Sequence, residues 1–215
     1  MRVLVVVAHP DDETLGAGGT IARMVAEGNI VYALAFTDGV GARNGKIGVR
    51  LDEWRQAIEV LGIKYGWVLD YPDNQLDTVP MLKLARRVTD TIIETTPDLV
   101  ITHHSGDLNI DHRRVREAVE VACRPIGKRI NILAMEVVSS TEWGTPFAPN
   151  YFVDIGPWLA VKRNALNDYE SELCDAPHPR SVDGVMNLAR IRGDQSGVLF
   201  AEAFEVVRWF YDGVN

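Results

Sequence analysis

The chain has 215 residues, of which 47% are hydrophobic and 24% are charged, the ordinary balance of a globular protein with a buried core. Its 22 Lys and Arg stand against 30 Asp and Glu, and the net charge of -8 argues against a nucleic-acid binder that relies on a basic face. The length favours a single domain over residues 1–215.

Short apolar runs rich in β-branched residues alternate with segments of helical period. The run at residues 3–7 has no polar alternation, which predicts a strand covered on both faces. Further strands are predicted at residues 32–37, 67–69, 99–102, 130–136 and 151–155. Helices are predicted around residues 54–61, 84–92, 115–122, 159–169 and 182–191. This alternation predicts an α/β fold with a mostly parallel sheet and helices on both faces.

Single residues mark where the predicted helices end. Gly62 is the expected C-cap of the helix over residues 54–61, and Asp111 is placed to N-cap the helix over residues 115–122. The segment Pro177–Arg180 continues neither neighbouring helix, because each proline removes a donor and restricts its neighbour. We expect a rigid loop there.

The cysteines and the N-terminal region indicate a cytoplasmic protein. Cys123 and Cys174 are far apart and lack a CxxC spacing, which argues against a disulfide framework and against a thiolate metal site. The apolar run at residues 3–7 is too short for a signal-peptide core or a membrane span. We therefore expect no membrane span.

Ionisable side chains concentrate where the first predicted strand ends. Residues 8–13 read Ala-His-Pro-Asp-Asp-Glu, with four ionisable groups in five positions. Burying such charges is costly unless something compensates them, and a divalent metal is the natural compensator. His9 and Asp12 offer one nitrogen and one oxygen ligand, and a tight site needs a third.

The segment after the fourth predicted strand offers that ligand. Residues 102–112 contain three of the five histidines of the chain. In a doubly wound sheet the first and fourth strands are neighbours at the switch point, so both following loops face one crevice. His112 then completes a set of two histidines and one carboxylate. His103 and His104 are expected to point to opposite faces of the strand, so that one of them is structural.

These motifs resemble the PIG-L/LmbE-like deacetylases, which remove acetyl groups from N-acetylated amino sugars. The resemblance rests on the motif at residues 8–13 and on Asp111-His112, and it continues in weaker matches. Those are Thr37-Asp38-Gly39, Arg50 with Glu53, and residues 177–181, 192–193 and 201–204. The resemblance implies one LmbE-like domain over residues 1–215 with a Rossmann-like three-layer sandwich.

The resemblance also implies a function and a site. It implies Zn²⁺ on His9, Asp12 and His112, a general base at Asp11 and a substrate contact from Arg50. Fe²⁺ or another divalent metal is an alternative, since two histidines and a carboxylate also bind iron. The implied substrate is a GlcNAc-like amino sugar, free or conjugated, which yields an amine and acetate. A homo-oligomer is implied, with no nucleic-acid partner.

One position departs from the family pattern. Many members have a histidine where this chain has Asn109, and an amide donates a hydrogen bond to an oxyanion but cannot release a proton at neutral pH. We expect Asp11 to serve as both base and acid; otherwise one of three histidines supplies the proton, His103, His104 or His178. Asp111 is assigned either to hold a catalytic neighbour in place or to cap its helix.

Further residues are predicted to contact the substrate. Trp143 follows the fifth predicted strand in a polar loop, and we expect it to stack on a sugar ring. Arg50 and Arg180 are expected to pair with a phosphate or carboxylate of the substrate, and for Arg180 a solvated or structural role is the alternative. His104 and His178 complete the predicted substrate-binding set.

Three other functions have weaker support. A non-haem iron oxygenase shares the ligand set, but its usual scaffold is a β jelly-roll. A nucleotide-binding module is suggested by Gly16, Gly18 and Gly19, whose spacing matches neither common phosphate-loop pattern. A non-catalytic sugar-binding relative is the third alternative, because Asn109 replaces a residue of the active site.

Overall fold

The computed structural model describes residues 1–41 and 47–211. Its strands form one sheet of seven in the order β3-β2-β1-β4-β5-β7-β6. They are β1 (Arg2–Val7), β2 (Ile30–Ala35), β3 (Tyr65–Val68), β4 (Leu99–His103), β5 (Asn131–Met135), β6 (Tyr151–Asp154) and β7 (Ala201–Arg208). Strands β1 to β5 pair in parallel, while β7 runs antiparallel to both β5 and β6. The predicted mostly parallel α/β fold is confirmed, and β7 is the one of these strands that was not predicted.

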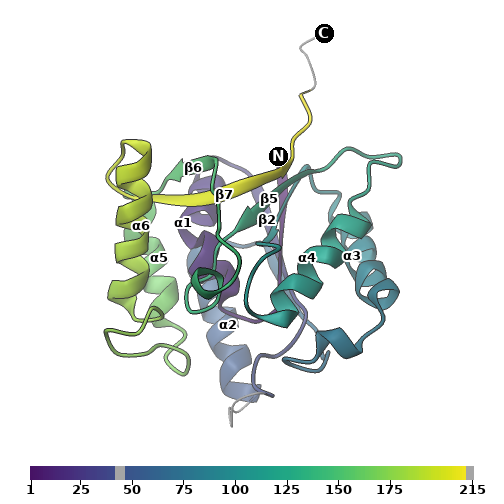
Figure 1. The fold of residues 1–215 in the computed structure, drawn as a ribbon, viewed down its shortest axis with the longest axis horizontal. Helices are drawn as coiled ribbons and strands as arrows, with labels where there is room; N and C mark the ends of the chain where they lie inside the picture. The colour runs from purple at the N-terminus through teal and green to yellow at the C-terminus, as the bar shows by residue number, and fades with distance from the viewer. Residues whose placement is uncertain (42–46, 212–215) are drawn as a thin grey trace.

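Helices cover both faces of this sheet (Figure 1). They are α1 (Asp12–Ala26), α2 (Ile47–Leu61), α3 (Met81–Thr95), α4 (Ile110–Ala122), α5 (Leu159–Asn167) and α6 (Val182–Ser196). Short 3-10 turns lie at Leu76–Thr78, Thr141–Trp143 and Gly156–Trp158. The side chains of β1 alternate between two cores: Val5 packs with residues of α1, α2, α5 and α6, and Val6 with residues of α3 and α4. Gly62 follows α2 with a φ of 74°, as the C-cap prediction required.

The order of the strands creates the crevice in which functional residues gather. The chain proceeds from β1 outward through β2 and β3, then returns to place β4 on the other side of β1. At such a switch point the loops after the two strands separate and leave a crevice beyond their carboxyl ends. The motif at residues 8–13 and the segment before α4 are those two loops. The predicted adjacency of the first and fourth strands is confirmed.

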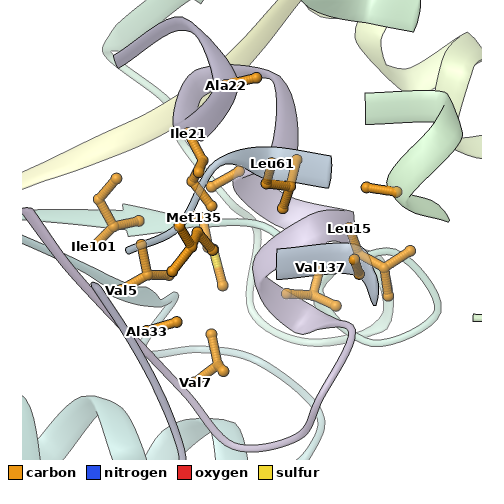
Figure 2. Packing of buried hydrophobic residues seen from close by; sticks show 14 of the residues in the cluster. Val5, Val7, Leu15, Ile21, Ala22, Ala33, Leu61, Ile101, Met135 and Val137 are labelled. Carbon is orange, nitrogen blue, oxygen red and sulfur yellow. The ribbon is translucent and has the colours of Figure 1, made fainter. Parts of the chain in front are cut away.

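Apolar side chains of helix α1 pack against those of the sheet (Figure 2), and the glycines after β1 allow this close approach. Gly16, Gly18 and Gly19 all lie within α1. A Cβ atom at Gly16 would lie 2.7 Å from Met135 Sδ, and one at Gly19 would lie 2.8 Å from Ile155 Cβ. No side chain fits at those separations without movement of the neighbours. These glycines therefore serve packing and do not form a phosphate loop.

A buried ion pair joins α1, α5 and β7. Lys162 Nζ lies 2.5 Å from Glu202 Oε1 and also donates to the Leu15 carbonyl at 2.8 Å. Glu202 in turn accepts backbone hydrogen bonds from Gly19 at 2.9 Å and Thr20 at 2.7 Å. Both charged side chains are almost fully buried, with exposed fractions of 3% and 4%. The pair thus satisfies polar backbone groups of α1 that face the protein interior.

Replacing Lys162 by Met is expected to destabilise the fold by about 3–5 kcal/mol, because it leaves the Glu202 carboxylate buried without its counter-charge. Urea unfolding followed by circular dichroism measures the change. The matched control is Lys128→Met, which removes an exposed lysine and should change the free energy of unfolding by less than about 0.5 kcal/mol. A loss below about 1 kcal/mol for Lys162→Met would contradict the importance assigned to this pair.

Candidate metal centre and active site

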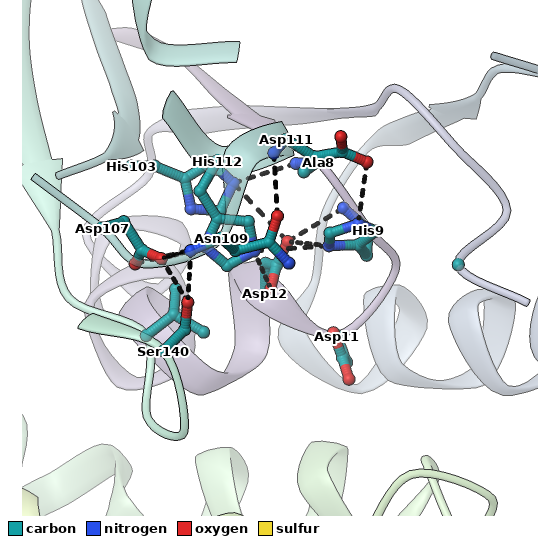
Figure 3. A network of polar contacts seen from close by, with 12 residues as sticks. Ala8, His9, Asp11, Asp12, His103, Asp107, Asn109, Asp111, His112 and Ser140 are labelled. Carbon is teal, nitrogen blue, oxygen red and sulfur yellow. Dashed lines mark hydrogen bonds and ion pairs between the residues drawn. The ribbon is translucent and has the colours of Figure 1, made fainter. Parts of the chain in front are cut away.

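Three side chains, here called the trio, converge on one point (Figure 3). His9 lies in the loop after β1, Asp12 is the first residue of α1, and His112 lies in the first turn of α4. His9 Nδ1 lies 3.2 Å from Asp12 Oδ2, and His112 Nε2 lies 3.4 Å from Asp12 Oδ1. The two imidazole nitrogens, His9 Nδ1 and His112 Nε2, are 3.3 Å apart. All three residues are buried, and their ligand atoms form a group able to hold one metal ion.

The separations between these atoms suit a bound cation. A tetrahedral ion held at 2.0–2.2 Å by nitrogen and oxygen ligands places those ligands about 3.3–3.6 Å from one another. The separations of 3.4 and 3.3 Å fall within that range, and the separation of 3.2 Å lies just below it. Two imidazoles and one carboxylate are also the donor set that zinc and iron(II) accept. The residues present therefore fit a divalent metal.

A carboxylate behind His112 orients its ring. Asp107 Oδ2 lies 3.2 Å from His112 Nδ1, the nitrogen that faces away from the trio. Asp107 also accepts hydrogen bonds from Thr141 Oγ1 at 2.6 Å, from Asn109 N at 2.8 Å and from Ser140 Oγ. Burial alone would raise the pKa of Asp107, but these contacts hold it well below its ordinary value. The ionised carboxylate thus directs Nε2 of His112 toward the metal position.

Two carboxylates perform the same task for His9. His9 Nε2 lies 3.1 Å from Asp73 Oδ1 and 3.4 Å from Asp111 Oδ2. Asp111 is fixed in turn, because it accepts backbone hydrogen bonds from Asn74 at 2.7 Å and Leu76 at 2.9 Å. A proton on Nε2 shared with these acceptors leaves the lone pair of Nδ1 directed at the trio. Of the two roles predicted for Asp111, the geometry favours holding a neighbour in place.

The other predicted role of Asp111, as helix cap, is wrong. Helix α4 begins at Ile110, and its N-cap is Asn109, whose Oδ1 accepts a hydrogen bond from Asp111 N at 2.8 Å. The helix starts earlier than its apolar stripe suggested, so Asp111 falls within the first turn. Asn109 Nδ2 faces Asn74 Oδ1 at 3.4 Å and lies on the wall of the cavity beside the trio.

His103 contacts residues of the site but does not line the cavity. It is fully buried at the end of β4, where its Nε2 accepts a hydrogen bond from Ala8 N at 2.9 Å. Its ring stacks on that of His112 with centroids 3.9 Å apart. Burial and the neighbouring His112 lower the pKa of His103 to about 3, which keeps the ring neutral. This histidine is therefore a poor source of the catalytic proton.

His104 and His178 do not line the cavity, contrary to their prediction as substrate contacts. His104 points to the other face of β4, as expected for consecutive strand residues. Its Nδ1 lies 2.8 Å from Glu205 Oε2, and its Nε2 lies 3.2 Å from the Thr145 carbonyl. His178 Nδ1 accepts a hydrogen bond from Arg180 N at 3.1 Å. Both rings thus stabilise local structure.

The trio opens onto a cavity of about 400 Å³, a volume sufficient for a sugar ring. Three of the predicted substrate contacts line it: Arg50, Trp143 and Arg180. The side chain of Trp143 is 56% exposed, which places an unoccupied aromatic face at the cavity wall. Arg50 and Arg180 are buried deeper, where both meet acidic partners.

Asp11 lies in the same cavity but points away from the trio (Figure 3). Its backbone has a φ of 112°, which turns the side chain away from that of Asp12. Asp11 Oδ2 accepts a hydrogen bond from Arg50 Nη2 at 3.3 Å and another from Arg180 Nη2. Glu172 contacts the same two guanidinium groups. Burial lowers the pKa of Arg50 and lowers that of Arg180 to about 10. The guanidinium group of arginine stays protonated in proteins, so both side chains are cationic at neutral pH.

Three acidic residues of the site were not predicted. Asp107 lies in the histidine-rich segment, and its place five residues before His112 was the available signal. Asp73 lies in the loop after β3, beyond the carboxyl end of a strand, where functional residues are expected. Glu172 follows α5, and no pattern in its surroundings distinguishes it from a solvated carboxylate.

The fold and the trio define an α/β protein with a candidate metal centre at the carboxyl ends of its parallel strands. The sequence profile of the PIG-L family, described as GlcNAc-PI de-N-acetylase, matches residues 4–123. The chain belongs to this family, as the resemblance of its motifs indicated. None of the helices within residues 1–41 and 47–211 has the length and apolar character needed to cross a membrane.

Known relatives agree with this membership. The diacetylchitobiose deacetylase of Thermococcus kodakarensis is 29% identical over 230 residues, which cover 96% of this chain and 83% of that protein. The solved structure of TT1542 from Thermus thermophilus has a TM-score of 0.83 at 25% identity and covers 99% of this chain and 98% of that one. GalB of Pseudomonas putida, a 4-carboxy-2-hydroxymuconate hydratase, has a TM-score of 0.76 at 22% identity, covering 100% and 99%. The fold alone therefore does not fix the reaction.

Proposed function

We propose that this protein is a zinc-dependent N-deacetylase that converts an N-acetylated amino sugar to the free amine and acetate. The observation that carries the proposal is the convergence of His9, Asp12 and His112 on one point in a cavity that also contains Asp11. The relatives support the class of substrate, since both the family description and the Thermococcus protein concern N-acetylglucosamine derivatives. When bound, a divalent metal supplies Lewis acidity at the scissile amide.

Asp11 is the proposed general base and acid. Both of its guanidinium contacts are made by Oδ2, which leaves Oδ1 to take the proton of the attacking water once the side chain has turned toward the trio. The same oxygen then returns this proton to the amine leaving group. None of the three alternative histidines lines the cavity, which supports the double role of Asp11.

Other cavity residues bind and orient the substrate in this proposal. Asn109 presents its amide Nδ2 at the cavity wall, from which it donates a hydrogen bond to the developing oxyanion. Trp143 stacks on the sugar ring through its exposed face. Asp111 acts through His9, and Arg50 orients Asp11.

The proposal extends to the organisation of the protein. Residues 1–215 form one LmbE-like domain, and the protein acts in the cytoplasm as a homo-oligomer without a nucleic-acid partner. The free thiols of Cys123 and Cys174 support a reducing compartment. The family resemblance supports the oligomer.

An acetate-release screen tests the proposed reaction. The substrates are N-acetylhexosamines, diacetylchitobiose and nucleotide conjugates, each offered to the enzyme after chelation and after addition of Zn²⁺ or Fe²⁺. We expect equal amounts of acetate and amine, lost on chelation and restored by the metal. Oxygen consumption in place of acetate release would instead identify an iron oxygenase. Sugar binding without acetate from any substrate, with any metal, would overturn the hydrolase assignment.

A further inference from the structure

The two arginines of the cavity are already paired with carboxylates of the protein. Arg50 Nη1 lies 3.0 Å from Glu172 Oε1, and Arg180 Nη2 lies 3.5 Å from Glu172 Oε2. Arg50 Nη2 and Arg180 Nη2 also contact Asp11 Oδ2, so the two guanidinium groups share both carboxylates. Among the described residues, these four side chains form a cluster of two positive and two negative charges, here called the arginine–carboxylate cluster.

The cluster is assembled from three separate parts of the chain and is shielded from solvent. Asp11 precedes α1, Arg50 lies on α2, and Glu172 and Arg180 lie between α5 and α6. The exposed side-chain fractions are 3% for Asp11, 3% for Arg50, 8% for Glu172 and 12% for Arg180. Water screens such contacts weakly, so the two carboxylates cancel most of the positive field of the arginines inside the cavity.

Apart from the imidazoles of the trio, the other charged side chains among the described residues that line the cavity are acidic. Among the described residues that line it, Arg50 and Arg180 are the only Lys or Arg, while Asp12 and Asp73 add negative charge to that of the cluster. A divalent metal on the trio would offset about two of these charges and leave no excess of positive charge. A phosphate or carboxylate entering the cavity would thus be repelled by Asp11 and Glu172. It would have to displace one of these carboxylates to form an ion pair with Arg50 or Arg180.

We infer that Glu172 determines specificity: by neutralising Arg50 and Arg180 together with Asp11, it restricts the cavity to uncharged amino sugars and disfavours phosphorylated or acidic ones. This inference rests on the proposed function for the identity of the sugar. The claim that Glu172 weakens the binding of anions at Arg50 and Arg180 does not depend on the reaction. It applies to any anion small enough to reach the arginine–carboxylate cluster.

The direct test is the binding of inorganic phosphate to the full-length protein, measured by isothermal titration calorimetry at low ionic strength. Glu172→Gln keeps the shape of the side chain and removes its charge, so the guanidinium groups gain an unopposed positive charge. We expect phosphate to bind at least about ten-fold more tightly than to the wild type, the scale set by one unit charge a few ångströms away in a partly buried site. The matched control is Glu170→Gln, an exposed carboxylate two residues away, which should leave phosphate affinity unchanged.

Two further variants keep the test decisive. Glu172→Gln combined with Arg180→Gln restores the charge balance and should return phosphate affinity to the wild-type value. Asp11→Asn removes the other carboxylate of the cluster and should give the same gain, which preserves the test if Glu172→Gln does not fold. A gain below ten-fold in the folded Glu172→Gln protein, or an equal gain in Glu170→Gln, would overturn the inference.

A kinetic comparison separates this inference from the proposed function. With N-acetylglucosamine and its 6-phosphate as substrates, Glu172→Gln should raise the ratio of kcat/KM for the phosphate over the neutral sugar by at least about ten-fold. An unchanged ratio in an active variant would count against Glu172 as the specificity residue. If no variant releases acetate from either sugar, the proposed reaction fails, and phosphate affinity still decides the role of Glu172.

Discussion

Asp11→Asn is expected to lower kcat for acetate release by about two to four orders of magnitude while the protein keeps its metal. Asn has the shape of Asp and tolerates the positive φ of 112° at this position, so the backbone should not change. Its amide cannot accept the proton of the attacking water. The side chain of residue 11 also points away from the trio, which is why metal binding should survive.

Steady-state kinetics and metal content per chain measure the two parts of this prediction separately. Asp70→Asn, an exposed carboxylate after β3, is the control and should leave both values unchanged. Wild-type kcat in the Asp11→Asn protein would show that another group transfers the proton. Loss of the metal would instead show that Asp11 maintains the trio.

The parallel part of the sheet was predictable because its signal is local. The residues of β1 from Val3 to Val7 are fully buried, and an unbroken apolar run requires cover on both faces. Strand β7 lacks such a signal, since it carries the glutamates Glu202 and Glu205. Their partners Lys162 and His104 lie 40 and 101 residues away along the chain, so the compensation that allows these charges in a sheet is visible only in three dimensions.

The same distinction between local and distant contacts explains what was predicted of the site. Topology brings the loop of His9 and Asp12 next to that of His112, because adjacent parallel strands end at one edge. The same rule indicates the loop of Asp73 only weakly, because β3 is not adjacent to β1 or β4. It does not indicate Glu172, which follows a helix and lies in a loop whose path depends on tertiary packing. His104 was predicted as a substrate contact because it belongs to a histidine-rich segment, yet strand geometry turns it toward Glu205.

His112→Ala should remove the metal and the activity together. It leaves only His9 and Asp12, and two protein ligands do not make a tight site. Asp107→Asn is the graded counterpart, because it removes the acceptor 3.2 Å from His112 Nδ1 but keeps the ligand itself. The loss of a partner that only orients a ligand lowers metal affinity by about 10- to 100-fold, and we expect His112→Ala to exceed that range.

Competition with a chromophoric chelator measures zinc affinity in each variant, and acetate release at saturating zinc measures activity. His178→Ala is the control for removing a histidine, since His178 lies outside the trio and should leave zinc affinity unchanged. For Asp107→Asn, saturating zinc should restore much of the activity, whereas His112→Ala should stay inactive because the ion lacks a ligand that fixes its position. Wild-type zinc affinity in His112→Ala would mean that the three side chains do not hold one ion. The proposed metal-dependent deacetylase mechanism would then be wrong.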